Sequence, residues 1–98
     1  MKRARFVSVA AHEFLAEVTY YEEARPGHGA RFIAAVQQAT ARALAFPLSG
    51  SPAAAGTRRV LVRDFPFSIV YRADAEGIVV FAVAHSARRP GYWQSRAG

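Results

Sequence analysis

The chain has 98 residues, of which 52% are hydrophobic and 20% charged, a balance typical of globular rather than disordered proteins. Because a separate hydrophobic core needs roughly 100 residues, we expect a single domain over residues 1–98 and exclude a two-domain enzyme. No apolar run approaches the roughly 20 residues that cross a bilayer, and no apolar stretch follows the basic start as in a secretory signal. We therefore expect a cytoplasmic protein that does not contact a membrane.

The residue types that bind metals or react as thiols are scarce. The chain has no cysteine, which excludes disulfides, thiol catalysis and thiolate metal sites. The three histidines, His12, His28 and His85, lie far apart and lack metal-ligand spacing. We expect no metal and no cofactor.

The charge is positive and unevenly distributed. Thirteen basic and seven acidic residues give a net charge of +6, and Lys2 is the only lysine. Residues 1–49 carry a net +2 and residues 50–98 a net +4. A GC-rich genome would explain arginine in place of lysine, but it does not explain this clustering. Because guanidinium groups pair with carboxylates and phosphates, the second half favours an acidic protein surface or a nucleic acid as partner.

The first half of the chain predicts a strand followed by two helices. Residues 5–9 alternate as a short strand, and residues 10–25 repeat apolar side chains at helical spacing. After a break at residues 26–29, a second helix is predicted for residues 30–46, ended by Pro47. So short a connection favours an antiparallel helical hairpin. Its expected core side chains are Phe32, Val36, Ala39, Ala43 and Phe46, and one of Tyr20 and Tyr21 should be exposed.

The second half predicts strands. A loop at residues 48–56 precedes three β-branched and aromatic runs, at residues 58–63, 67–72 and 78–85, which indicate a three-stranded meander. The last run is apolar at nearly every position, which is typical of a central strand. Residues 86–96 form a basic, aromatic tail that is too short and broken for another core element.

These elements predict an α+β fold in which the helical hairpin packs on one face of a four-stranded, mainly antiparallel sheet. No helix remains to cover the other face. We expect a partner to bind on this open face, with the tail beside it.

Three segments carry a resemblance to a known family. They are Tyr20-Tyr21-Glu22-Glu23 with Gly29-Ala30-Arg31-Phe32, the run from Arg58 to Arg72 around Phe65-Pro66-Phe67, and the ending from Val83 to Trp93. Over almost the whole chain the sequence resembles the RelE/ParE superfamily of type II toxin–antitoxin systems, often described as plasmid stabilisation proteins. The resemblance implies a toxin that a cognate antitoxin holds inactive.

Two activities occur in that superfamily. ParE-like members poison DNA gyrase by binding, whereas RelE-like members cut mRNA on the ribosome without a metal, using lysines, arginines and a tyrosine near the C-terminus. This chain has no lysine after Lys2, which favours the ParE-like branch, without catalytic residues. The alternative is a ribosome-dependent endoribonuclease with His85 as proton carrier, Arg88 as phosphate clamp and Tyr92 as auxiliary acid or stacking platform. A third interpretation is a toxin-like fold that has lost toxicity.

The candidate residues for binding the target or the antitoxin lie on the strands and the tail. The strand arginines could instead form a solvated edge with ion pairs to Asp64 and Asp74; these are Arg58, Arg59, Arg63 and Arg72. His85 could end its strand with a structural hydrogen bond, and Trp93 could simply pin the tail. The set comprises Arg58, Arg59, Arg63, Arg72, Arg88, Arg89, Tyr92, Trp93 and Arg96. The resemblance implies a ParD-like antitoxin with an acidic C-terminal segment, DNA gyrase as the target, and contact with operator DNA only through the antitoxin.

Overall fold

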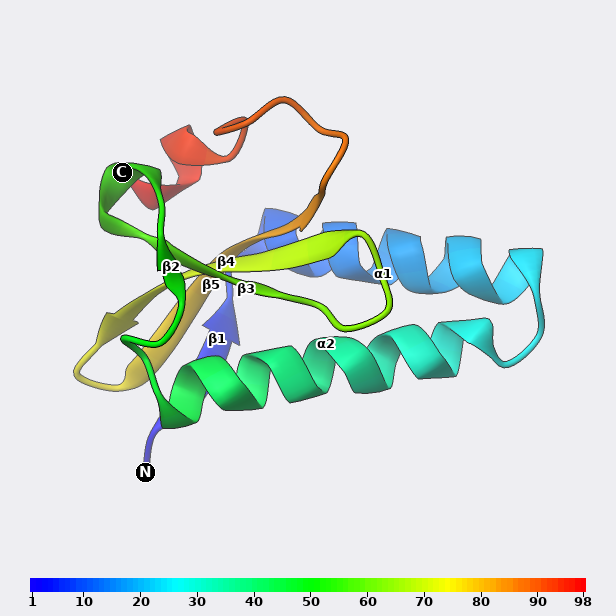
Figure 1. The fold of residues 1–98 in the computed structure, drawn as a ribbon, viewed down its shortest axis with the longest axis horizontal. Helices are drawn as coiled ribbons and strands as arrows, with labels where there is room; N and C mark the ends of the chain where they lie inside the picture. Colours follow the sequence, from blue (N-terminus) through cyan, green and yellow to red (C-terminus); the bar gives the residue numbers. More distant parts are fainter.

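The computed structural model describes residues 1–98 and places two helices against one face of a five-stranded sheet (Figure 1). In chain order the elements are β1 (Arg3–Phe6), α1 (Ser8–Ala24), α2 (His28–Ala45), β2 (Ser51–Pro52), η1 (Ala54–Gly56), β3 (Arg58–Leu61), β4 (Phe67–Asp74), β5 (Gly77–His85) and η2 (Gln94–Ala97). The predicted α+β fold is confirmed. Neither helix combines the length and hydropathy that crossing a bilayer requires.

The sheet has the order β1-β5-β4-β3-β2, in which β1 runs parallel to β5 and all other pairs are antiparallel. The meander and the central position of β5 are as predicted. The strand number is not, because two residues of the expected loop, Ser51 and Pro52, pair with Arg59 and Arg58. The first strand spans Arg3–Phe6 instead of residues 5–9, since α1 already begins at Ser8.

Backbone contacts fix β1 beside β5. Gly77, at the start of β5, has φ +133°, and a Cβ there would lie only 2.1 Å from the backbone oxygen of Arg3. Glycine is therefore needed both for the backbone conformation and for the close approach of β1. The Arg5 guanidinium then donates to Asp74 at 2.6 Å and to Glu76 at 3.1 Å, and its hydrogen bond holds the pKa of the Asp74 carboxyl below its usual range.

The two helices form the expected antiparallel hairpin. Glu22 in α1 accepts hydrogen bonds from the backbone N–H groups of Gly27 and Gly29, and so satisfies donors at the start of α2 that have no partner within the helix. A Cβ at Gly29 would meet the Val18 oxygen at 2.9 Å, so the helices cross closely at this point.

The main core lies between the helices and the sheet. Phe32, Val36, Ala39 and Ala43 are buried there, as their spacing predicts, and Tyr20 is the exposed member of the tyrosine pair. Phe46 is 68% exposed, so its assignment to the core was wrong. The reason is that α2 ends at Ala45, and Phe46 adopts φ −133° and ψ 73°, which takes its side chain out of the helical stripe.

A second, smaller cluster lies on the other face of the sheet, where no cover was expected. Trp93 from the tail packs on Val70 and Ala82, and all three side chains are buried. Figure 1 shows the C-terminal segment on the opposite side of the sheet from α2. The expectation of a wholly open face is therefore corrected: the chain's own tail covers part of it, because the Trp93 side chain packs on Val70 and Ala82 despite the short, irregular backbone of the tail.

Candidate binding groove

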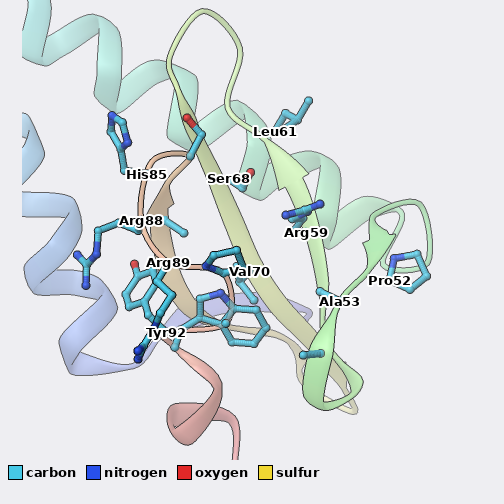
Figure 2. Close-up of a pocket in the computed structure, with 16 residues that line it drawn as sticks. Pro52, Ala53, Arg59, Leu61, Ser68, Val70, His85, Arg88, Arg89 and Tyr92 are labelled. Carbon is cyan, nitrogen blue, oxygen red and sulfur yellow. The ribbon is translucent and has the colours of Figure 1, made fainter.

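The part of this face that stays open is a groove of about 440 Å³ between the sheet and the tail, which we call the arginine groove. Its floor comes from β3, β4 and β5, and its wall is the tail from Ser86 to Trp93 (Figure 2). The lining residues are Pro52, Ala53, Ala54, Arg59, Leu61, Ser68, Val70, Ala84, His85, Ser86, Arg88, Arg89, Pro90, Gly91, Tyr92 and Trp93.

Strand alternation explains which side chains reach this floor. In β3 the exposed positions are Arg59 and Leu61, and Leu61 is 72% exposed although it is aliphatic. Ser68 of β4 lies opposite Ala84 of β5 in the register, and both side chains are on the same face of the sheet as Arg59 and Leu61. The result is a shallow apolar and hydroxyl-bearing floor flanked by cationic side chains.

The charge of the groove has one sign. Arg59 comes from β3, and Arg88 and Arg89 come from the tail, where the Arg88 side chain extends toward α1 (Figure 2). No aspartate or glutamate is among the lining residues, and none of these three guanidinium groups forms an ion pair. The groove therefore suits an anionic partner that also carries apolar side chains.

The wall of the groove is held by Glu13, a residue of α1. Its Oε2 accepts a hydrogen bond from the Tyr92 hydroxyl at 2.8 Å, and its Oε1 accepts from Arg96 Nη1 at 3.0 Å and from the backbone N–H of Val83 at 3.1 Å. Arg96 Nη1 also donates to the Phe81 oxygen at 3.1 Å. One carboxylate thus joins the tail, α1 and β5.

Tyr92 is fixed by contacts on its ring as well as on its hydroxyl. The Arg88 guanidinium carbon lies 3.9 Å from the ring centroid and that of Arg96 lies 5.0 Å away. Burial, followed by the hydrogen bond to Glu13, raises the pKa of the Tyr92 phenol to about 12. The phenol is thus protonated at neutral pH, and its proton is directed at Glu13 rather than into the groove.

His85 does not join Arg88 and Tyr92 in a reactive cluster. It lies opposite Phe67 in the strand register, and the two rings are in edge contact at 4.9 Å on the core side of the sheet. Its Nδ1 accepts the backbone N–H of Ala87 at 2.9 Å, which matches the structural hydrogen bond at the end of the strand. The residues of the nuclease alternative are therefore near one another in sequence but not directed at a common point.

Other candidate arginines are engaged elsewhere. Arg58 donates to the backbone oxygens of Leu48 and Gly50, and Arg72 donates to the oxygen of Ala55. Neither arginine pairs with Asp64 or Asp74.

Two further candidates also lie away from the groove lining. Arg63 borders a separate hollow beside Arg31 of α2, and Arg96 binds Glu13. The arginine groove thus brings together five of the candidates: Arg59, Arg88, Arg89, Tyr92 and Trp93.

Sequence reasoning missed the residues that complete the groove. No local pattern connects Glu13, within the first predicted helix, to a tail more than 70 residues away. Leu61 and Ser68 were part of strand runs, and alternation alone does not say which face stays open.

A sequence model described as the ParE toxin of the type II toxin–antitoxin system, parDE, matches residues 5–90. The chain belongs to the ParE toxin family. No curated protein matches the chain in sequence. The ParE-like resemblance of the sequence is confirmed.

A solved structure supports the ParE fold independently. The structure described as a chromosomal ParDE toxin–antitoxin system from P. aeruginosa superposes with a TM-score of 0.74 at 18% sequence identity. The match covers 87% of this chain and 96% of the other. At this identity the likeness is one of fold, and the fold is that of a ParE-type toxin.

Proposed function

We propose that this ParE-type toxin inhibits DNA gyrase by binding it through the arginine groove, without chemistry of its own. The observation that carries the proposal is the groove itself: Arg59, Arg88 and Arg89 line it, none of them forms an ion pair, and no acidic side chain is in the lining. His85, Arg88 and Tyr92 are each held in separate contacts. This arrangement supports docking rather than acid–base catalysis.

The aromatic residues of the groove favour a protein partner over single-stranded nucleic acid. Proteins that hold unpaired bases offer free aromatic faces for stacking. Here the Tyr92 ring is in contact with Arg88 and Arg96, and Trp93 is only 6% exposed. An acidic and apolar protein segment would pair with the arginines while covering the exposed Leu61.

The same chemistry suits a ParD-like antitoxin. We infer that its acidic C-terminal segment, extended or helical, lies in the arginine groove and excludes the target by occupying the same surface. Operator DNA would then be contacted by the antitoxin alone. The groove has no lining carboxylate to repel such a segment, and its arginines attract the acidic side chains of the segment.

The test compares Arg59→Glu with Arg25→Glu, which places the same change on an exposed arginine outside the groove. We expect the wild-type chain and Arg25→Glu to block gyrase supercoiling, and Arg59→Glu to weaken gyrase binding at least about tenfold, a loss of about 1.4 kcal/mol.

Primer extension on translated mRNA is run in parallel with the supercoiling assay. Site-specific cuts in the message, with supercoiling intact, would replace the proposal with the nuclease alternative. Normal growth when the toxin is induced without its antitoxin would instead show a chain that has lost toxicity.

A further inference from the structure

We propose that Glu13 is the positioning residue of the arginine groove: its carboxylate, on α1, fixes the tail in the place where Arg88, Arg89 and Trp93 form the groove wall. The effect on target binding rests on the function proposed above. The positioning of the tail does not, because it follows from contacts within the chain.

The first step of the argument is the edge of β5. Strand β1 ends at Phe6, opposite Val80, so the following residues of β5 have no neighbouring strand on that side. Side chains take the place of the missing strand. Glu13 accepts the Val83 N–H, and Arg96 donates to the Phe81 oxygen. The tail is therefore attached where the sheet would otherwise leave backbone groups unpaired.

The second step is the convergence of the contacts on one group. Three donors from three segments meet the Glu13 carboxylate: Tyr92, Arg96 and Val83. The Glu13 and Arg96 side chains are only 16% and 18% exposed, so their ion pair is shielded from solvent more than a surface pair would be. Removing the carboxylate would leave the Tyr92 hydroxyl without its acceptor and the partly buried Arg96 guanidinium without its counter-charge, with only the Phe81 oxygen to accept from it, which favours release of the tail.

The third step separates this role from helix stability. Alanine has a higher helix propensity than glutamate, so Glu13→Ala should not weaken α1 as a helix. Glutamine keeps a side-chain oxygen that can still accept the Val83 N–H but carries no charge for Arg96. If the carboxylate positions the tail, Glu13→Ala should therefore release the tail more than Glu13→Gln does.

Trp93 provides a direct readout of the position of the tail. It is the only tryptophan of the chain, and in the tail's observed position it is buried against Val70 and Ala82. We expect acrylamide quenching of Trp93 fluorescence to rise several-fold in Glu13→Ala and less in Glu13→Gln, with the circular dichroism of the helices unchanged. Glu17→Gln, one turn further along α1 at a residue with no ion pair, should match the wild type.

Binding of purified gyrase is measured on the same variants. We expect Glu13→Ala to bind about tenfold more weakly than the wild type, and Glu13→Gln to recover part of the loss. If the wild-type chain does not bind gyrase, the proposed function fails while the quenching experiment still decides the role of Glu13.

Quenching of Trp93 in Glu13→Ala that equals the wild-type value would overturn the positioning role, whatever gyrase does. If Glu13→Ala unfolds the whole chain, quenching of Trp93 is measured in Tyr92→Phe instead, which removes only the hydroxyl that donates to Glu13. Increased quenching in that variant supports the proposal, and unchanged quenching contradicts it.

Discussion

At the scale of single residues, the Tyr92 phenol is one of the groups that hold the tail, and it does so in its protonated form. The phenol donates to Glu13, and its pKa is raised to about 12 by burial and by that hydrogen bond. In the unfolded chain the phenol ionises near its ordinary value of about 10. The contribution to folding is therefore complete below about pH 10 and is lost as the pH rises towards about 12.

We predict that Trp93 fluorescence in the wild type shows release of the tail over this alkaline range. Ionised Tyr92 cannot donate to Glu13, and the two negative charges repel each other. Burial raises the pKa of Tyr21 as well, which weakens the helix side of the core at high pH. Tyr92→Phe is the control, because it keeps Tyr21 and removes the titrating group of the tail. An identical alkaline transition in this variant would contradict the prediction.

At the scale of elements, the turn between β3 and β4 is attached to the helical hairpin by aromatic packing. The Phe65 ring lies 5.0 Å from Tyr21, 5.1 Å from Phe32 and 5.5 Å from His28, measured between centroids. Phe67 extends the cluster at 5.2 Å from Phe32. This cluster fixes the strands that carry the groove floor relative to both helices.

We predict that Phe65→Ala lowers the free energy of unfolding by about 2–3 kcal/mol, slightly less than for a fully buried phenylalanine. Phe46→Ala is the matched control. Because Phe46 is exposed, its loss should change stability by no more than about 0.5 kcal/mol. Urea denaturation of the two variants measures both values, and equal losses would show that the cluster contributes nothing specific.

Element boundaries also show where local patterns stop being informative. The existence of the first helix and of the meander strands follows from periodicity, which neighbouring residues set among themselves, although the helix begins at Ser8 rather than at residue 10. The two-residue strand at Ser51–Pro52 exists only because β3 lies beside it. The burial of Trp93 likewise needs Val70 and Ala82, which no pattern within the tail indicates.

At the scale of the whole molecule, some charged side chains form ion pairs within the chain, whereas the arginines that line the groove do not. Glu13, Asp74 and Glu76 form ion pairs with Arg96 and Arg5. The guanidinium groups that remain unpaired at the groove are those of Arg59, Arg88 and Arg89. The net charge of +6 is thus presented to a partner in part as one concentrated patch.

We predict that association with the antitoxin is steered by this patch and is sensitive to salt. The association rate constant should fall about tenfold between about 0.05 M and about 0.5 M salt, since the Debye length shortens over this range. Arg59→Gln should flatten the dependence, and Arg25→Gln should leave it unchanged. Stopped-flow measurement at several salt concentrations tests this, and a rate independent of salt would argue against steering by the groove.

By itself, the sequence determined the order of helices and strands, the meander with its central strand, most of the helix core and the ParE-like resemblance. These depend on periodicity, turn residues and motifs, which act over a few neighbouring positions. Tertiary structure alone decided that the tail covers part of the open face, that Glu13 holds it, and that only Arg59, Arg88 and Arg89 of the candidate arginines line the groove. Those outcomes depend on contacts between segments distant in sequence, for which local spacing carries no signal.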